Sequence, residues 1–125
     1  MLNYTEKWHS FSQSEVNAYN KMIKDTNPIH YDEDFCKNTI FQAPIVPGLL
    51  TASLFGGLLG SSLPDGAILL GQNLKFILPV YMDERIRAVV EFKEQRDDKP
   101  IIIFKTTCYK SDDEVAIDGE AVIRL

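Results

Sequence analysis

Hydrophobic residues near the start of the chain recur at the spacing of one helix face. The positions of this face are Val16, Tyr19, Met22 and Ile23. Such intervals of three and four residues are typical of an amphipathic helix. Ser12 followed by Glu15 has the spacing of a capping box, which marks a helix start. The pattern therefore predicts a helix over residues 13–24.

A second apolar stretch is longer and different in kind, because residues 40–64 contain no charged side chain. Pro44 and Pro47 shorten the helix that this stretch can form to residues 47–63. No basic residues flank it closely, as membrane orientation usually requires, so a helix buried within a folded domain is favoured over a membrane span. Residues 32–38 have the composition of a short surface helix, and residues 40–46 form an irregular lead into the apolar helix.

One face of the apolar helix is nearly free of side chains. Gly48, Ala52, Gly56 and Gly60 recur at intervals of four residues and therefore share a face. Glycine inside a helix costs about 1 kcal/mol relative to alanine, so its repetition needs a reason. Either close packing against a sheet or an elongated ligand lying along this face would supply one.

The second half of the chain changes to β-type patterns. Apolar and β-branched runs at residues 67–79, 85–95, 101–109 and 115–125 are separated mainly by polar turn sequences. Residues 85–92 alternate between apolar and mostly polar positions, whereas residues 101–104 are continuously apolar and predict a strand covered on both faces. Four consecutive strands joined in this way predict an antiparallel sheet, with the long helix against it.

Composition bounds the class of protein. The 125 residues are 45% hydrophobic, which suits one domain over residues 1–125 with a real core. A net charge of −5 without a Lys/Arg cluster argues against a nucleic-acid partner. Cys36 and Cys108 lack metal-ligand or redox-motif spacing, so we expect no metal, and a reducing, cytoplasmic compartment. Residues 1–9 show no apolar core of the kind that a secretory signal needs.

The strongest chemical signal lies where the first helix must end. Asp25 and His30 flank Pro28, which biases Asn27 away from helical geometry and predicts a rigid bend with an acid on one side and a base on the other. Such a corner can hold a water molecule between two titratable groups. The alternative is structural: Asp25 as a polar residue at a helix end and His30 as a buried histidine bonded to a backbone carbonyl.

A second chemical signal lies at the start of the apolar helix. The sequence Pro47-Gly48 is typical of a helix entrance with proline at the first helical position. The Gly48 N–H would then be unpaired, at the positive end of the helix dipole, and unobstructed by a side chain. This donor can receive an oxygen on which negative charge develops.

Three motifs together resemble a known family. Residues 25–30 (DTNPIH), 41–50 (FQAPIVPGLL) and 70–76 (LGQNLKF) are similar to the MaoC-like (R)-specific enoyl-CoA hydratases of the hot-dog fold, and the match runs over nearly the whole chain. The resemblance extends to residues 98–100 and 119–121. It implies an α+β fold consisting of a single hot-dog domain, in which an antiparallel sheet wraps around the long apolar helix.

The resemblance also implies an activity. Asp25 and His30 would jointly activate a water for syn addition to a trans-2-enoyl thioester, giving a (3R)-hydroxyacyl product, with Gly48 N–H stabilising the enolate. The residues expected to bind substrate are Asn27, which mainly shapes the bend, with Pro47, Gly56 and Gly71. No cofactor or metal is expected, because the coenzyme A thioester is itself the substrate.

Two positions depart from the family pattern. The family usually has histidine at the position of Pro47, and many members have serine at that of Gly56. Two alternatives therefore stay open: a (3R)-hydroxyacyl dehydratase acting on an acyl-carrier-protein thioester, and a catalytically silent subunit that binds acyl groups or pairs with an active partner. The resemblance further implies a homodimer with a continuous sheet, and neither a membrane nor a nucleic-acid partner.

Overall fold

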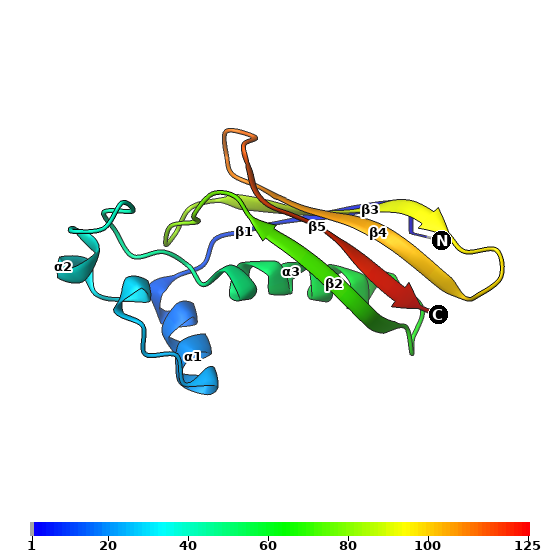
Figure 1. Cartoon of the computed structure of the whole chain (residues 1–125), viewed down its shortest axis with the longest axis horizontal. Coiled ribbons are helices and arrows are strands. Elements are labelled where there is room, and N and C mark those ends of the chain that lie inside the picture. Colours follow the sequence, from blue (N-terminus) through cyan, green and yellow to red (C-terminus); the bar gives the residue numbers. More distant parts are fainter. Residues whose placement is uncertain (1) are drawn as a thin grey trace.

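Five antiparallel strands form one curved sheet, and a long helix crosses its concave face (Figure 1). The computed structural model describes residues 2–125. The strands are β1 (Tyr4–His9), β2 (Ile68–Phe76), β3 (Ile86–Gln95), β4 (Ile101–Tyr109) and β5 (Val115–Arg124). The helices are α1 (Gln13–Ile23), the 3₁₀ turn η1 (Pro28–His30), α2 (Glu33–Cys36) and α3 (Gly48–Ser62).

The strand order is β1-β3-β4-β5-β2, and every pairing is antiparallel, as predicted. The chain neighbours β2 and β3 do not pair, however, because β2 lies on β5 at one edge of the sheet. The opposite edge is β1, which the sequence pattern missed. Its residues are mostly exposed and include Glu6 and Lys7, so it carries no hydrophobic alternation.

The predicted pattern of β3 is confirmed except at Phe92, which is 39% exposed, and the predicted burial of β4 is wrong. Ile86, Ala88 and Val90 face the core. In β4, Ile102 and Phe104 are buried, but Ile101 and Ile103, on the opposite face, are only partly buried because no other element of residues 2–125 covers that part of the sheet. Here the continuously apolar run predicts a strand correctly, but it does not indicate that both faces of the strand are covered.

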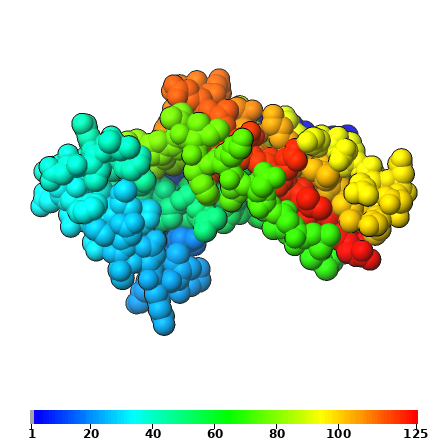
Figure 2. Space-filling model, viewed as in Figure 1, coloured from blue at the N-terminus to red at the C-terminus, as the bar shows by residue number. Residues whose placement is uncertain are grey.

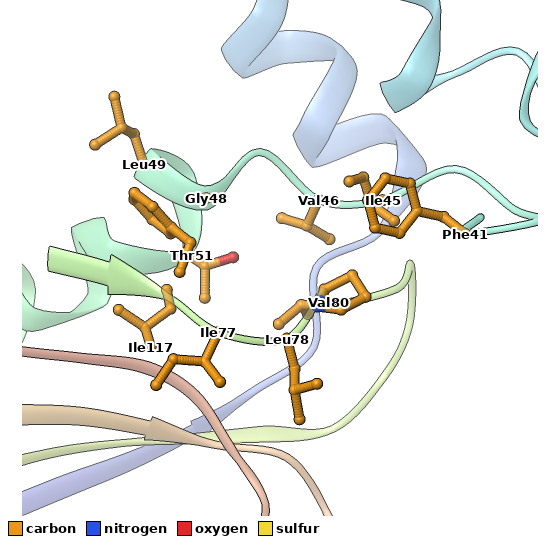
Figure 3. A pocket seen from close by; sticks show the side chains of 12 residues that line it. Phe41, Ile45, Val46, Gly48, Leu49, Thr51, Ile77, Leu78, Val80 and Ile117 are labelled. Carbon is orange, nitrogen blue, oxygen red and sulfur yellow. The ribbon is translucent and has the colours of Figure 1, made fainter. Parts of the chain in front are cut away.

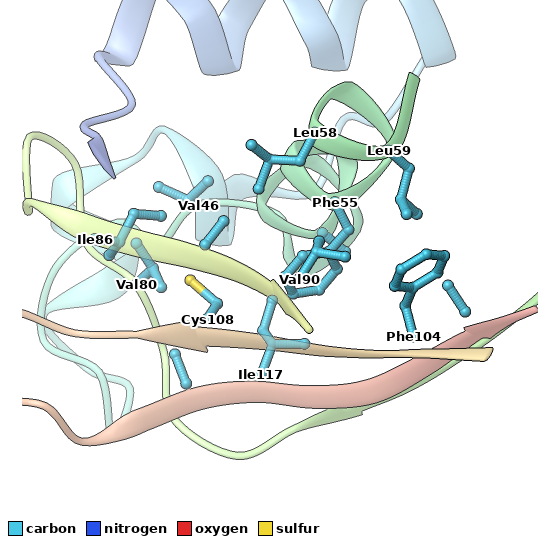
Figure 4. Close-up of a cluster of buried hydrophobic side chains, with 14 of the residues drawn as sticks. Val46, Phe55, Leu58, Leu59, Val80, Ile86, Val90, Phe104, Cys108 and Ile117 are labelled. Atoms are coloured by element: carbon cyan, nitrogen blue, oxygen red, sulfur yellow. The ribbon is translucent and has the colours of Figure 1, made fainter. Parts of the chain in front are cut away.

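Helix α3 supplies one side of the hydrophobic core. Figure 4 shows Phe55 and Leu59 of α3 directed at the side chains of Val90 and Phe104 on the sheet, and Leu58 belongs to the same buried cluster. The helix begins one residue later than predicted, because Pro47 is its N-cap rather than its first helical residue. Within residues 2–125, no helix has the length and apolar character needed to span a membrane.

The glycine face of α3 is turned toward the β2 edge of the sheet, where Gly56 and Gly60 border a small cavity with Leu69 and Ile123. A Cβ atom placed on Gly56 or Gly60 would meet no heavy atom within 4 Å, and both residues are exposed. Close packing within the chain therefore explains neither glycine. It does explain Gly48, where a Cβ atom would lie 2.5 Å from the Phe76 ring.

The segment between β1 and α3 forms a lobe beyond one end of the sheet, which is coloured blue to cyan in Figure 2. Helix α1 begins with the predicted capping box between Ser12 and Glu15. It ends at Lys24, whose backbone is left-handed at φ 61°. The predicted surface helix at residues 32–38 is shorter in the structure, with Asp32 as the N-cap of α2.

Candidate active site

The bend after α1 is built by its own polar side chains. The Asn27 backbone N–H donates to Asp25 Oδ1 at 2.9 Å, which fixes the carboxylate. The Asn27 Oδ1 in turn accepts from the Ile29 N–H at 3.2 Å and caps the 3₁₀ turn that Pro28 begins. The turn ends at His30, so Asp25 and His30 are brought together as the sequence predicts. Asn27 shapes this bend, also as predicted.

Asp25 and His30 face each other across a short gap. His30 Nε2 lies 3.6 Å from Asp25 Oδ2, and the two side chains are 12% and 30% exposed. This separation exceeds a direct hydrogen bond, but one water oxygen can lie about 2.8–3.0 Å from both atoms. The partial exposure gives such a water access from solvent.

A backbone carbonyl determines which nitrogen of His30 faces Asp25. His30 Nδ1 lies 2.8 Å from the Ile45 carbonyl oxygen. A carbonyl oxygen only accepts, so Nδ1 carries the hydrogen in this contact. In the neutral imidazole this leaves the lone pair on Nε2, directed toward Asp25. The ring is therefore oriented as a proton acceptor toward the gap.

Several contacts that the sequence did not reveal hold the turn in place. The Ile29 carbonyl accepts from the Ile45 N–H at 3.1 Å and from the Cys36 thiol at 3.4 Å. Burial, and then the Asp32 carboxylate, raises the pKa of that thiol and keeps it a donor. The His30 carbonyl accepts from Gln13 Nε2 at 2.9 Å. Most of these contacts use backbone atoms, which leave no mark in a sequence.

The N-terminus of α3 presents unpaired donors. The first intrahelical bond runs from the Thr51 N–H to the Pro47 carbonyl, and Pro47 offers no capping side chain. The N–H groups of Gly48, Leu49 and Leu50 consequently have no acceptor among residues 2–125. Gly48 is partly exposed, so its N–H is positioned as an anion donor at the positive end of the helix dipole.

Gly48 borders an apolar cavity of about 420 Å³. Figure 3 shows that its wall combines side chains of α3, such as Leu49 and Thr51, with Phe41 and Ile45 from the segment before that helix. The remaining wall is mainly Phe76, the last residue of β2, with residues 77–80 that follow it. Ile45 thus lines the cavity with its side chain while its carbonyl holds His30.

The other predicted site residues are not gathered around this cavity. Gly56 borders a second, smaller cavity of about 110 Å³ together with Leu59, Leu63 and Ile123. Pro47 is buried at the helix start and lines neither cavity. Gly71 lies beside a β-bulge in edge strand β2, also outside both. Within residues 2–125, no three His, Cys, Asp or Glu side chains cluster as metal ligands would.

The family of the chain follows from a comparison with known domains. A family model described as a MaoC-like domain matches residues 3–115. The chain belongs to the MaoC-like family.

Two MaoC-like relatives and one solved structure illustrate the similarity. The chain is 45% identical to an (R)-specific enoyl-CoA hydratase of Aeromonas caviae, covering 92% of this chain and 87% of the relative. It is 41% identical to a mitochondrial 3-hydroxyacyl-[acyl-carrier-protein] dehydratase of Solanum lycopersicum, over 93% and 71%. A solved (R)-hydratase from A. caviae involved in PHA biosynthesis matches with a TM-score of 0.94 at 42% identity, over 98% and 94%.

The match in fold confirms the hot-dog architecture. The structure shows where the two departures from the family pattern, Pro47 and Gly56, lie. Pro47 is the N-cap, so Gly48 is the first helical residue and its N–H has no intrahelical acceptor. Gly56 leaves room on the exposed helix face where a hydroxyl would otherwise stand.

Proposed function

We propose that this MaoC-like protein catalyses the (R)-specific, reversible hydration of trans-2-enoyl-CoA to (3R)-hydroxyacyl-CoA. The observation that carries the proposal is the arrangement of His30 Nε2 and Asp25 Oδ2, 3.6 Å apart with the imidazole tautomer fixed by Ile45. The names of the similar proteins, (R)-specific enoyl-CoA hydratases among them, support the same reaction.

The reaction needs a base, because water is a weak nucleophile with a pKa near 15.7. A water held between Asp25 and His30 gives one proton to His30 Nε2 while its oxygen bonds to the β-carbon of the enoyl group. The resulting imidazolium, stabilised by the Asp25 carboxylate, returns a proton to the α-carbon on the same face. One water is thus added across the double bond, and the pair ends in its starting state.

The electron pair of the double bond moves onto the thioester oxygen during the addition. We assign the Gly48 N–H as the donor to that oxygen, an interaction often worth about 3–4 kcal/mol in the transition state. The thioester itself accepts the electrons, so the reaction as proposed needs no cofactor, and coenzyme A is part of the substrate.

We propose that the acyl chain lies along the small-residue face of α3, which is open at Gly56 and Gly60. The distance from Gly48 to Gly60 along the helix is about 18 Å, at about 1.5 Å per residue. This face leads from the Gly48 donor to the cavity beside Gly56 and Gly60. Gly56 and Gly60 present no side chain that would obstruct an extended acyl group at this end of the face.

We also propose that the protein is a homodimer joined through β2. This edge strand exposes Ile68, Leu69 and Leu70, each about half exposed. Edge β1 instead carries Glu6 and Lys7, charges that discourage strand pairing. A second copy added at β2 would continue the sheet and cover the apolar residues. A cytoplasmic location completes the proposal, supported by the two buried, unpaired thiols.

An acyl-carrier-protein thioester is the second candidate substrate. The similarity to the S. lycopersicum dehydratase, named for that carrier, favours it specifically. The chemistry at Asp25 and His30 would be the same, with only the carrier changed. A silent acyl-binding subunit is the remaining alternative, and it predicts no turnover with either carrier.

The test is the loss of ultraviolet absorbance of the conjugated enoyl group when purified protein is mixed with crotonyl-CoA. Chiral analysis of the product should give the (R)-alcohol alone. The same acyl group on coenzyme A and on acyl-carrier protein, at equal concentration, separates the two candidate substrates. No turnover with either carrier at any acyl length refutes the proposed function.

A further inference from the structure

A polar cluster outside the catalytic groups described so far connects the loop after β2 to the residue that follows β4. It consists of Tyr81, Glu84 and Lys110. The Lys110 ammonium donates to Glu84 Oε1 at 2.9 Å and to the Pro79 carbonyl, and it lies 5.4 Å from the centre of the Tyr81 ring. The same Glu84 oxygen accepts from the Tyr81 N–H at 3.1 Å. One lysine thus ties both ends of the loop together.

The burial of this ion pair sets it apart from the other lysine pairs of the chain. The Lys110 and Glu84 side chains are only 14% and 20% exposed, whereas those of Lys93 and Glu120 are 51% and 35% exposed. A largely buried charge must keep its partner, because leaving one charge unpaired is costly. This largely buried ion pair therefore holds the loop in one conformation, which an exposed ion pair would do less firmly.

The loop is attached to the segment that precedes α3. The Tyr81 hydroxyl donates to the Phe41 carbonyl at 2.9 Å, forty residues away in sequence. Tyr81 and Ile45 also form an antiparallel bridge, and the Val46 N–H donates to the Val80 carbonyl at 2.8 Å. Both ends of residues 41–46 are thus fastened to the loop.

Residues 41–46 in turn carry the group that sets the His30 tautomer. The Ile45 carbonyl is the acceptor for His30 Nδ1–H, and the Ile45 N–H binds the carbonyl of Ile29 in the catalytic turn. A shift of this segment by a few tenths of an ångström would weaken a 2.8 Å contact that depends on distance and angle. The cluster and His30 are connected through a single short stretch of backbone.

From these contacts we infer that Tyr81, Glu84 and Lys110 are positioning residues for His30, acting through residues 41–46. The inference rests on the proposed hydratase function for its kinetic consequence, but the structural link to His30 is independent of that function. The cluster touches no reacting atom; it keeps the Ile45 carbonyl where His30 needs it.

The direct test is the tautomer of His30, observed by NMR of protein labelled with ¹⁵N-histidine. The chain has two histidines, so a His9→Gln variant assigns both signals. In the wild type, His30 should be protonated at Nδ1 with a free Nε2. In Tyr81→Phe, which removes only the hydroxyl, and in Lys110→Met, the signals should move toward a mixture of the two tautomers.

Kinetics with crotonyl-CoA give the second readout. Both variants should lose about five- to tenfold in kcat, the effect of about one hydrogen bond, while KM changes by less than about twofold. Tyr109→Phe and Lys93→Met are the matched controls. The Tyr109 hydroxyl has no bonded partner within residues 2–125, and Lys93 pairs with Glu120 on the outer face of the sheet. Both controls should match the wild type in tautomer and kcat.

If Tyr81→Phe and Lys110→Met keep the wild-type tautomer, the inference is wrong, even if both proteins melt at lower temperature. A lowered melting temperature with an unchanged tautomer would mark the cluster as purely structural. Because the NMR measurement needs no substrate, a wild type without hydratase activity would refute the proposed function and still leave this test decisive.

Discussion

At the scale of single residues, the proposed chemistry depends on hydrogen bonds made by backbone groups. The Ile45 carbonyl assigns the proton on His30, and the Asn27 N–H fixes the Asp25 carboxylate. The donor at Gly48 is likewise a backbone group, free because Gly48 is the first residue of α3 and its N–H has no intrahelical acceptor. Every substitution except proline keeps the backbone N–H. A backbone donor is therefore tested with a proline variant.

Gly48→Pro should abolish the oxyanion donor while keeping the helix. Proline is well tolerated at the first helical position, and Pro47 already has the extended ψ of 131° that a following proline requires. We expect kcat to fall by about 10²–10³, the range for loss of an oxyanion donor. Steady-state kinetics with crotonyl-CoA measure the change.

Gly48→Ala is the control for this substitution. It also places a Cβ atom against the Phe76 ring but keeps the N–H. The alanine variant should therefore lose much less activity than the proline variant. Equal losses in the two would mean that crowding of Phe76, rather than the missing donor, limits the reaction.

Cys108 should make stability depend on alkaline pH. Burial, and then the charge of Glu84, raises the pKa of its thiol to about 12. The unfolded thiol ionises near pH 9 and the folded one does not, so this contribution is complete below about pH 9 and is lost as pH rises toward about 12. At about pH 10 the loss is about 1.4 kcal/mol relative to neutral pH.

Urea unfolding of the wild type and of Cys108→Ala, each at about pH 8 and about pH 10, checks this expectation. The alanine variant is less stable at both pH values because of its cavity, so the comparison concerns only the pH dependence. An identical loss of stability in both proteins would contradict the assignment to Cys108.

At the scale of elements, the glycine face of α3 gives a prediction in which stability and activity change in opposite directions. Gly56→Ala should stabilise the fold by up to about 1 kcal/mol, because the new methyl group meets nothing within 4 Å. If the acyl chain lies along this face, the same methyl group should lower kcat/KM for long-chain enoyl-CoA more than for crotonyl-CoA. Thermal unfolding and a chain-length series measure the two effects.

Gly57→Ala is the matched control, since its Cβ atom also meets nothing and Gly57 borders neither cavity. It should give a similar gain in stability with an unchanged chain-length profile. If the chain-length dependence of kcat/KM changes in both variants, or in neither, the acyl chain does not lie along the glycine face.

The same elements show what the sequence could and could not predict. Helical spacing and a capping box located α1 to within a residue, and the charge-free stretch located α3. Strand β1 escaped because an exposed edge strand needs no hydrophobic alternation. The partner of β2 escaped because strand order depends on how α3 carries the chain across the sheet, which no local pattern encodes.

The candidate site was likewise predictable from the sequence only in part. The Asp25–His30 corner was predictable, because Pro28 acts locally on the backbone that joins them. The roles of Ile45, Cys36 and Gln13 were not, since they depend on contacts between segments distant in the chain.

At the scale of the whole molecule, the two edges of the sheet differ in a way that predicts assembly. Strand β2 exposes Leu70, 53% accessible, among other apolar residues, whereas β1 is charged. We expect Leu70→Lys to convert a dimer into a monomer, because the new charge would have to be buried at the continuing edge. Sedimentation equilibrium or light scattering measures the mass.

Tyr4→Lys on the opposite edge is the control, and it should remain dimeric. Tyr4 is similarly exposed but lies on β1. A monomeric wild type, or loss of the dimer in both variants, would contradict the assignment of β2 as the interface.

The proposed function rests on Asp25 and His30, which together activate water for addition to an enoyl thioester. The most direct measurement follows the absorbance of crotonyl-CoA with wild type and Asp25→Asn side by side, with chiral analysis of the product. We expect rapid loss of absorbance and an (R)-hydroxy product for the wild type. The variant should turn over at least about 10²-fold more slowly, since a positioned acid–base group contributes about 10²–10⁴. Equal rates for the two proteins would contradict this role of Asp25 and His30.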